Sequence, residues 1–356
     1  MKKALITIAA LLLAACGGNE KTSTTGTAAG SAPAAAQGKV VAINGAGATF
    51  PYPIYSKWFD EYSKTHPNVR VNYQSIGSGG GIKQLSAQTV FFGASDMPMT
   101  DQQLKDAPHP ILHFPTVLGG VVPIYNIPGV TAQLHFSGPT LANVYLGKIT
   151  KWNDKQIAAE NPGVALPATD IAVVHRSDGS GTTFIFCDFL SKTSPEFKQK
   201  VGASTSVQWP AGVGAKGNEG VSGLVQQTPG AVGYVELIYS LQNKIPFGAV
   251  RNKAGEYVTA TLDSVTAAAA GAAAHMPDDF RVSITDADGK DAYPISSFTW
   301  MLFYEKPSDK ERAKIMTDFL KWALSDGQQF ATNLRYAPLP KSVVDKELQV
   351  LARISS

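Results

Sequence analysis

The chain has 356 residues, a formal net charge of +3, 44% hydrophobic residues and 17% charged residues. This length suits about two domains with buried cores. The small net charge argues against a nucleic-acid-binding protein, because such proteins need a basic surface to neutralise phosphates. The composition also excludes collagen, a coiled coil, a polytopic membrane protein and a fully disordered chain.

The N-terminus has the pattern of a secretory signal. Two lysines precede an apolar stretch from Ala4 to Ala15, which is too short to span a membrane. The segment Leu13-Ala14-Ala15-Cys16-Gly17 resembles a bacterial lipobox. We therefore expect residues 1–15 to be a signal peptide and Cys16 to be lipidated, with the protein exported to the periplasm or cell surface and anchored to a membrane. An ordinary signal peptide with a coincidental cysteine is the alternative.

Residues 16–39 are rich in Gly, Ser, Thr, Ala and Pro, which predicts a flexible tether. Cys187 is the second of only two cysteines, so no intramolecular disulfide is expected. It falls in the apolar run Thr183 to Cys187, which favours a buried, inert side chain over a catalytic thiol.

The segments after the tether alternate between strand and helix patterns. The first part predicts strand 39–43, helix 51–63, strand 69–73, helix 81–88 and strand 90–94. This order predicts an α/β unit with a parallel sheet. The later part predicts strand 118–125, helix 140–146, strand 171–174, helix 182–190, strand 232–235, helix 267–274, strand 297–303 and the amphipathic helix 308–325.

Three turns rich in glycine and hydroxyl residues stand just before predicted helices, at residues 45–51, 77–81 and 176–183. Helix N-termini leave backbone N–H groups unpaired and carry partial positive charge. Glycine lets an anion approach the backbone, and Ser or Thr adds a donor. Each turn alone is more simply a helix cap. Three that converge would form an anion site made of neutral donors.

Two charged residues refine this hypothesis. Arg176 lies in the third turn and offers a planar fork of donors for an oxyanion, and the neighbouring Asp178 could hold it in place. Asp96 follows the predicted strand 90–94, at the carboxyl edge where open α/β sheets bind ligands. A carboxylate there favours only an anion that still carries a proton, so it selects phosphate over sulfate. A helix N-cap is the alternative for Asp96.

Several of these segments resemble the signature segments of bacterial phosphate-binding proteins, the receptors of the high-affinity phosphate ABC importer. The resemblance extends in order from Val41 to about Val344. Its most specific segments are residues 43–51, 93–96, 176–182, 217–220, 226–236 and 336–340.

The resemblance implies a set of phosphate-binding residues: Thr49, Phe50, Ser78, Asp96, Arg176, Ser180, Gly181 and Thr182, with Asp178 orienting Arg176. In this family pattern Phe50 donates through its backbone N–H, and Asp96 accepts the phosphate proton. Gly79 stands where a second serine is common, which removes at most one auxiliary hydroxyl.

The resemblance also implies an α/β, two-lobed class II periplasmic-binding-protein fold with two hinge crossings. The crossings would lie near residues 118–122 and 292–297. Lobe I would then be residues 40–117 plus 297–356, and lobe II residues 118–296. The implied protein is a monomer that binds inorganic phosphate and delivers it to an ABC permease, without catalysis, cofactor, metal or nucleic acid.

Other functions remain open from the sequence. A receptor for sulfate, molybdate or arsenate is the first; Asp96 argues against the unprotonated ions but not against arsenate. A hydrolase using Ser180 or Ser78 is the second, although no activating base or metal motif accompanies either serine. A scavenger or sensor of phosphate without a permease is the third.

Overall fold

The structure is a computed structural model, and it describes residues 39–354. The predicted signal peptide, Cys16 and the tether up to residue 38 lie outside the described residues. Within residues 39–354, no helix is long and apolar enough to cross a membrane.

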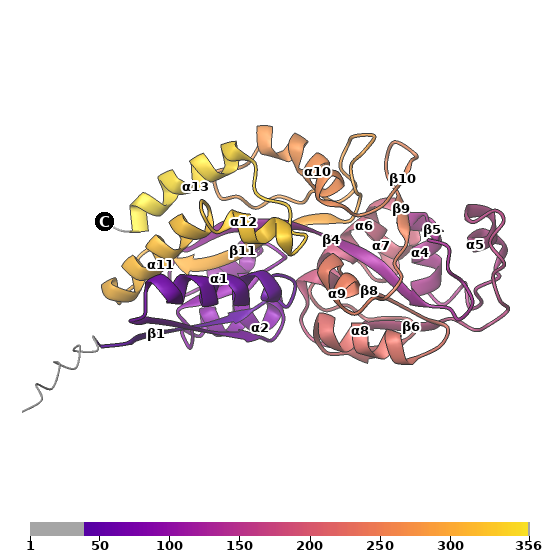
Figure 1. Ribbon diagram of the computed structural model, residues 1–356, viewed down its shortest axis with the longest axis horizontal. Helices are drawn as coiled ribbons and strands as arrows, with labels where there is room; N and C mark the ends of the chain where they lie inside the picture. Colours follow the sequence, from indigo (N-terminus) through magenta and orange to yellow (C-terminus); the bar gives the residue numbers. More distant parts are fainter. Residues whose placement is uncertain (1–38, 355–356) are drawn as a thin grey trace, which may run out of the picture. The chain divides into compact units, whose positions relative to one another are not determined.

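The first five elements alternate between strand and helix (Figure 1). They are β1 (Val41–Gly47), α1 (Tyr52–Thr65), β2 (Val69–Ser75), α2 (Ser78–Ser86) and β3 (Phe92–Ser95). Strand β1 pairs in parallel with both β2 and β3. The predicted α/β unit with a parallel sheet is therefore confirmed.

The remaining elements follow with short connections. The strands are β4 (Ile111–Asn126), β5 (His135–Phe136), β6 (Ala172–Arg176), β7 (Val213–Ala215), β8 (Ala231–Glu236), β9 (Ala249–Arg251), β10 (Tyr257–Val258) and β11 (Ser296–Tyr304). The helices are α3 (Asp101–Asp106), α4 (Gly138–Tyr145), α5 (Lys155–Glu160), α6 (Gly181–Thr193), α7 (Pro195–Lys200), α8 (Gly217–Gln227), α9 (Leu237–Gln242), α10 (Leu262–Ala274), α11 (Lys310–Ala323), α12 (Gln328–Asn333) and α13 (Lys341–Ile354).

A long strand, β4, joins two groups of strands. The sheet order is β2-β1-β3-β11-β4-β8-β6-β7, and β4 has 16 residues. Residues 111–120 of β4 pair with β11, whereas residues 121–126 pair with β8, both antiparallel. Figure 1 shows β4 running from one group into the other. Residues 118–122, near which a crossing is expected, include the point where β4 changes partner.

A β-bulge interrupts the pairing of β4 with β11. Thr299 lies opposite Val117, but the next residue, Trp300, lies opposite Pro115, so Thr116 is the extra residue. Pro115 has no backbone N–H and cannot donate to the ladder, which explains a bulge at this point in a central strand. Bulges of this kind redirect side chains next to functional sites.

The structure moves some predicted boundaries and adds elements. Helix α2 begins at Ser78 rather than residue 81, because packing against β1 and β3 outweighs the low helix propensity of three consecutive glycines. The sequence did not predict β5, β7, β9 and β10, which have only two or three residues each. Cys187 is free and fully buried, as predicted, and burial raises the pKa of its thiol.

Helix α13 carries a buried carboxyl group in an apolar setting. Glu347 is fully buried, and neither of its carboxyl oxygens has a hydrogen-bond partner among the described residues. Burial holds the pKa of Glu347 well above its ordinary value of 4.5. The folded protein therefore keeps a proton on Glu347 that the unfolded chain releases as the pH rises above that value.

Replacing Glu347 should stabilise the protein at neutral pH. An unpartnered buried polar group costs about 1–3 kcal/mol, so Glu347→Leu should raise the free energy of unfolding by about that amount at pH 7. The gain should shrink as the pH falls towards 4.5, because the unfolded chain then also carries a proton on Glu347 and folding no longer requires its uptake. Urea unfolding at several pH values measures both effects. A Glu347→Leu protein less stable than wild type at pH 7 would contradict this account.

Candidate anion-binding site

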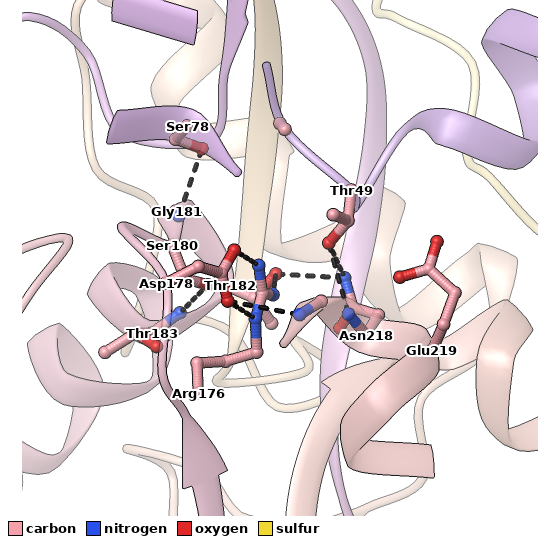
Figure 2. Close-up of polar contacts among 12 residues, drawn as sticks. Thr49, Ser78, Arg176, Asp178, Ser180, Gly181, Thr182, Thr183, Asn218 and Glu219 are labelled. Atoms are coloured by element: carbon pink, nitrogen blue, oxygen red, sulfur yellow. Dashed lines mark hydrogen bonds and ion pairs between the residues drawn. The ribbon is translucent and has the colours of Figure 1, made fainter. Parts of the chain in front are cut away.

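The structure brings the three glycine- and hydroxyl-rich turns together at the N-termini of α1, α2 and α6 (Figure 2). The Ser78 hydroxyl oxygen, in the first turn of α2, accepts from the backbone N–H of Gly181 at 3.0 Å. The backbone N–H of Gly79 donates to the Gly179 carbonyl at 2.8 Å. The second and third turns therefore touch through both side chain and backbone.

Asn218, at the start of α8, links the first turn to the third. Its side-chain amide donates to the hydroxyl of Thr49 at 2.8 Å and to that of Thr182 at 3.3 Å (Figure 2). Its amide oxygen accepts from the backbone N–H of Glu236 at 3.1 Å, which fixes the orientation of the amide. All four residues are buried. The hydroxyls of Thr49 and Thr182 are thus held a short distance apart.

The helix N-termini differ in how they are capped. No side chain caps α1 or α2, whose preceding residues are Pro51 and Gly77. In α6 the Ser180 hydroxyl accepts from the backbone N–H of Thr183 at 3.0 Å, and it keeps its own proton free to donate. First-turn N–H groups that no cap satisfies are donors for an anion. Phe50 precedes the cap residue Pro51 and so lies just before α1, with its ring fully buried.

Two glycines permit the close approach of the turns. Gly77 has a φ of +89°, and a Cβ there would lie 2.4 Å from a carboxylate oxygen of Asp178. A Cβ on Gly181 would lie 2.5 Å from the Ser78 hydroxyl oxygen and 2.6 Å from the Cβ of Asp96. Any larger residue at either position would separate the turns.

Arg176 and Asp178 form a buried bidentate ion pair (Figure 2). The guanidinium donates from Nε and Nη2 to the two Asp178 oxygens at 2.7 and 2.6 Å, and its side chain is only 1% exposed. Burial would raise the pKa of Asp178, but the hydrogen bonds and charge of Arg176 outweigh it and lower that pKa. Nη1 points to the Thr182 hydroxyl at 3.4 Å. The guanidinium is thus fixed in orientation and its charge is balanced.

Asp96 is buried where β3 ends. Its Oδ1 accepts from the hydroxyl of Thr299 at 2.7 Å, and its Oδ2 lies 3.4 Å from the hydroxyl oxygen of Ser78. Burial raises the pKa of Asp96 to about 7, although Thr299, Arg176 and Ser78 each act to lower it. The helix-cap alternative is wrong, because α3 begins at Asp101 and Thr100 caps it.

Sequence reasoning missed two of these residues. Thr299 donates to Asp96 from β11, 203 positions away along the chain. A single threonine inside the apolar run from Phe298 to Phe303 was the available signal, since a buried hydroxyl needs a partner. Asn218 lay in a segment noted for its resemblance, but nothing local to it indicated a role.

The site offers no machinery for hydrolysis or metal binding. Among residues 39–354, no group of three or more His, Cys, Asp or Glu side chains could hold a metal ion. His113 is a core residue whose ring accepts from the backbone N–H of Met99 at 3.0 Å, and burial lowers its pKa to about 3. Ser78 contacts Asp96 and backbone N–H groups, and Ser180 caps α6. The arrangement offers an anion several hydrogen-bond donors and one buried carboxyl group that can accept a proton.

Sequence comparison with known proteins places this chain in one family. Residues 23–327 match the family described as a PBP superfamily domain. The chain is 49% identical over 313 residues to the phosphate-binding protein PstS of Xylella fastidiosa, covering 88% of this chain and 85% of that protein. It is 47% identical to the phosphate-binding protein PstS of Pasteurella multocida, covering 85% of this chain and 88% of that protein.

Solved structures share the fold at low sequence identity. The phosphate-binding protein of Stenotrophomonas maltophilia superimposes with a TM-score of 0.68 at 21% identity, covering 89% of this chain and 95% of that chain. A high-affinity periplasmic phosphate-binding protein with bound phosphate at pH 8.5 gives a TM-score of 0.67 at 21% identity, covering 86% of this chain and 93% of that chain.

The buried ion pair should contribute strongly to stability. Asp178→Asn leaves the Arg176 charge buried without its counter-charge, which should lower the free energy of unfolding by about 3 kcal/mol. The matched control is Glu196→Gln, which breaks the exposed pairs of Glu196 with Lys148 and Lys200 and should cost under about 1 kcal/mol. Urea unfolding at pH 7 measures both values. Equal losses in the two variants would show that the Arg176–Asp178 pair is not effectively buried.

Proposed function

Because this chain belongs to the family of phosphate-binding PstS proteins, we propose that it receives inorganic phosphate outside the cytoplasm and delivers it to an ABC importer. Proteins of this family bind and release their ligand without chemical change, and this chain is not an enzyme. Its fold is that of the PBP superfamily.

The observation that carries the proposal is the position of Asp96. Its carboxyl group is buried close to Gly181 and the Arg176 guanidinium, and it accepts a hydrogen bond from the Ser78 hydroxyl at 3.4 Å. A carboxylate among donors repels a fully deprotonated anion and accepts a hydrogen bond from one that keeps a proton. Phosphate near neutral pH keeps a proton, whereas sulfate does not. The site therefore suits phosphate.

We assign the phosphate contacts to residues whose geometry fits the role. The hydroxyls of Thr49 and Thr182 lie on either side of the Asn218 amide, and Arg176 is already oriented by Asp178. The first turns of α1, α2 and α6 supply backbone N–H groups. The complete proposed set is Thr49, Phe50, Ser78, Asp96, Arg176, Ser180, Gly181 and Thr182.

The division into two lobes supports a closing motion. In the proposed division, lobe I contains residues 40–117 and 297–356 and lobe II contains residues 118–296. The bonds of Ser78 to Gly181 and of Thr49 to Asn218 then join one lobe to the other. A hinge opening would break these bonds and expose the site to solvent, which is the usual route of ligand entry in two-lobed receptors.

Export and membrane anchoring form a further part of the proposal. They rest on the signal and lipobox patterns of residues 1–17 and on a tether long enough to hold a folded monomer away from a membrane. Delivery to a permease separates this proposal from a stand-alone scavenger or sensor of phosphate.

The selectivity of the site should depend on Asp96. Calorimetric titration at pH 8 should give one tight phosphate site and sulfate binding about 10- to 150-fold weaker, since a hydrogen bond to a charged group contributes about 1.5–3 kcal/mol. Asp96→Asn replaces the acceptor by an amide that can donate, so it should reduce the phosphate-to-sulfate ratio by at least about 10-fold. The exposed Asp106→Asn is the control. Equal binding of sulfate and phosphate by the wild type would refute the role of Asp96.

Phosphate affinity should fall as the pH drops below about 7. The pKa of Asp96 is raised to about 7, so its proton is increasingly present below that pH and must leave before the carboxylate can accept from phosphate. Binding at pH 6 should therefore release protons, and the apparent affinity should decrease by up to about 10-fold per pH unit. Titrations in two buffers with different ionisation enthalpies measure the release. Asp96→Asn should release fewer protons at the same pH.

A further inference from the structure

A series of buried hydrogen bonds leads from Asp96 into the core. The Thr299 hydroxyl donates to Asp96 Oδ1 at 2.7 Å. The Thr116 hydroxyl donates to the backbone carbonyl of Thr299 at 3.1 Å, and the Tyr55 hydroxyl lies 2.9 Å from the Thr116 hydroxyl oxygen. Tyr55, Thr116 and Thr299 are fully buried, and Asp96 is 1% exposed. The series thus connects α1, β4 and β11 to the floor of the site.

The single proton on each hydroxyl fixes the direction of these hydrogen bonds. Thr116 donates its proton to the Thr299 carbonyl, so Tyr55 must be the donor in its bond with Thr116. Thr299 donates its proton to Asp96. The hydroxyls of Tyr55 and Thr116 thus donate in sequence towards the backbone carbonyl of Thr299, and the Thr299 side chain separately donates to Oδ1 of Asp96.

The β-bulge places the members of this series. Thr116 is the extra residue of the bulge, beside the Val117 that pairs with Thr299, and its hydroxyl reaches the Thr299 carbonyl across the strand pair. The next residue, Trp300, turns to the other side, where its indole N–H donates to the Phe280 carbonyl. The side chain of Thr299 is thereby held towards Asp96.

We propose that Thr299 is a positioning residue that sets the anion selectivity of the site: by occupying Oδ1, it keeps Asp96 an acceptor and directs Oδ2 towards the bound oxyanion. This inference rests on the proposed phosphate-binding function. Without the Thr299 hydroxyl, the carboxyl group is free to rotate and to keep a proton. A protonated Asp96 can donate to an unprotonated anion such as sulfate.

The charges and titratable groups around Asp96 agree with this role. Among the groups that lower its pKa, Thr299 has the largest effect, ahead of Arg176 and Ser78. The buried carboxyl of Glu236 and the buried hydroxyls of Tyr55, Tyr73 and Tyr336 also lie close enough to interact with the Asp96 charge. Arg176 is the cation that faces Asp96, and Asp178 already balances its charge. The Thr299 hydroxyl is therefore the contact best placed to keep Asp96 ionised.

The test replaces Thr299 by its isostere valine and by serine, which keeps the hydroxyl. In the ligand-free protein, carbon NMR of the Asp96 carboxyl group should show its pKa raised by about one pH unit or more in Thr299→Val, since the lost hydrogen bond is to a charged group. Thr299→Ser should titrate close to the wild type. The control is Thr317→Val, which removes a buried hydroxyl bonded within α11, away from the site.

The same variants should differ in anion binding. At pH 7, Thr299→Val should lower the phosphate-to-sulfate affinity ratio by at least about 10-fold, and Thr299→Ser should restore it to within about threefold. Should Thr299→Val fail to fold, Thr299→Ala carries the same test. An unchanged Asp96 titration in the folded variant would overturn the role of Thr299. Absence of phosphate binding by the wild type would instead overturn the proposed function. The NMR titration uses the ligand-free protein, so its result does not depend on that function.

Discussion

The buried pair of Arg176 with Asp178 determines how the rest of the site must work. Because the aspartate balances the guanidinium charge, the site carries no free positive charge to attract an anion. Attraction then has to come from oriented dipoles: hydroxyl groups, backbone N–H groups and helix N-termini. Such donors are effective only when they converge on one point and water is excluded. The requirement explains why three helices begin at this site and why glycine occupies the points of closest approach.

The same requirement makes the carboxyl group of Asp96 effective. In a site with a strong net positive charge, one carboxylate would matter little to which anion binds. In a site of neutral donors, the protonation of a buried carboxyl changes the hydrogen-bonding pattern completely. Its pKa near 7 lies close to the range in which phosphate itself loses a proton. In the proposed function, anion selectivity therefore depends on the hydrogen bonds behind the site, which the bulge in β4 positions.

The features that the structure brings together at this point could be recognised in the sequence because each of them is local. The turns, Arg176 with Asp178, and Asp96 after a strand all carry their signals within a few residues. The contacts between distant segments could not be predicted in this way. Asn218 reaches Thr49 across 169 positions, and nothing near either residue indicates the other. The start of α2 at Ser78 was also missed, since its glycines oppose helix formation and only packing reveals it.

The position of β11 in the sheet has a consequence for how the chain folds. This strand lies between β3 and β4, yet it is made from residues 296–304. Until those residues are synthesised, the facing edges of β3 and β4 have no partner, and Asp96 lacks Thr299. Pairings so distant in sequence form slowly, because a long loop must close first. The central part of this sheet therefore cannot be completed until most of the chain is present, and the edges of β3 and β4 stay unpaired until then.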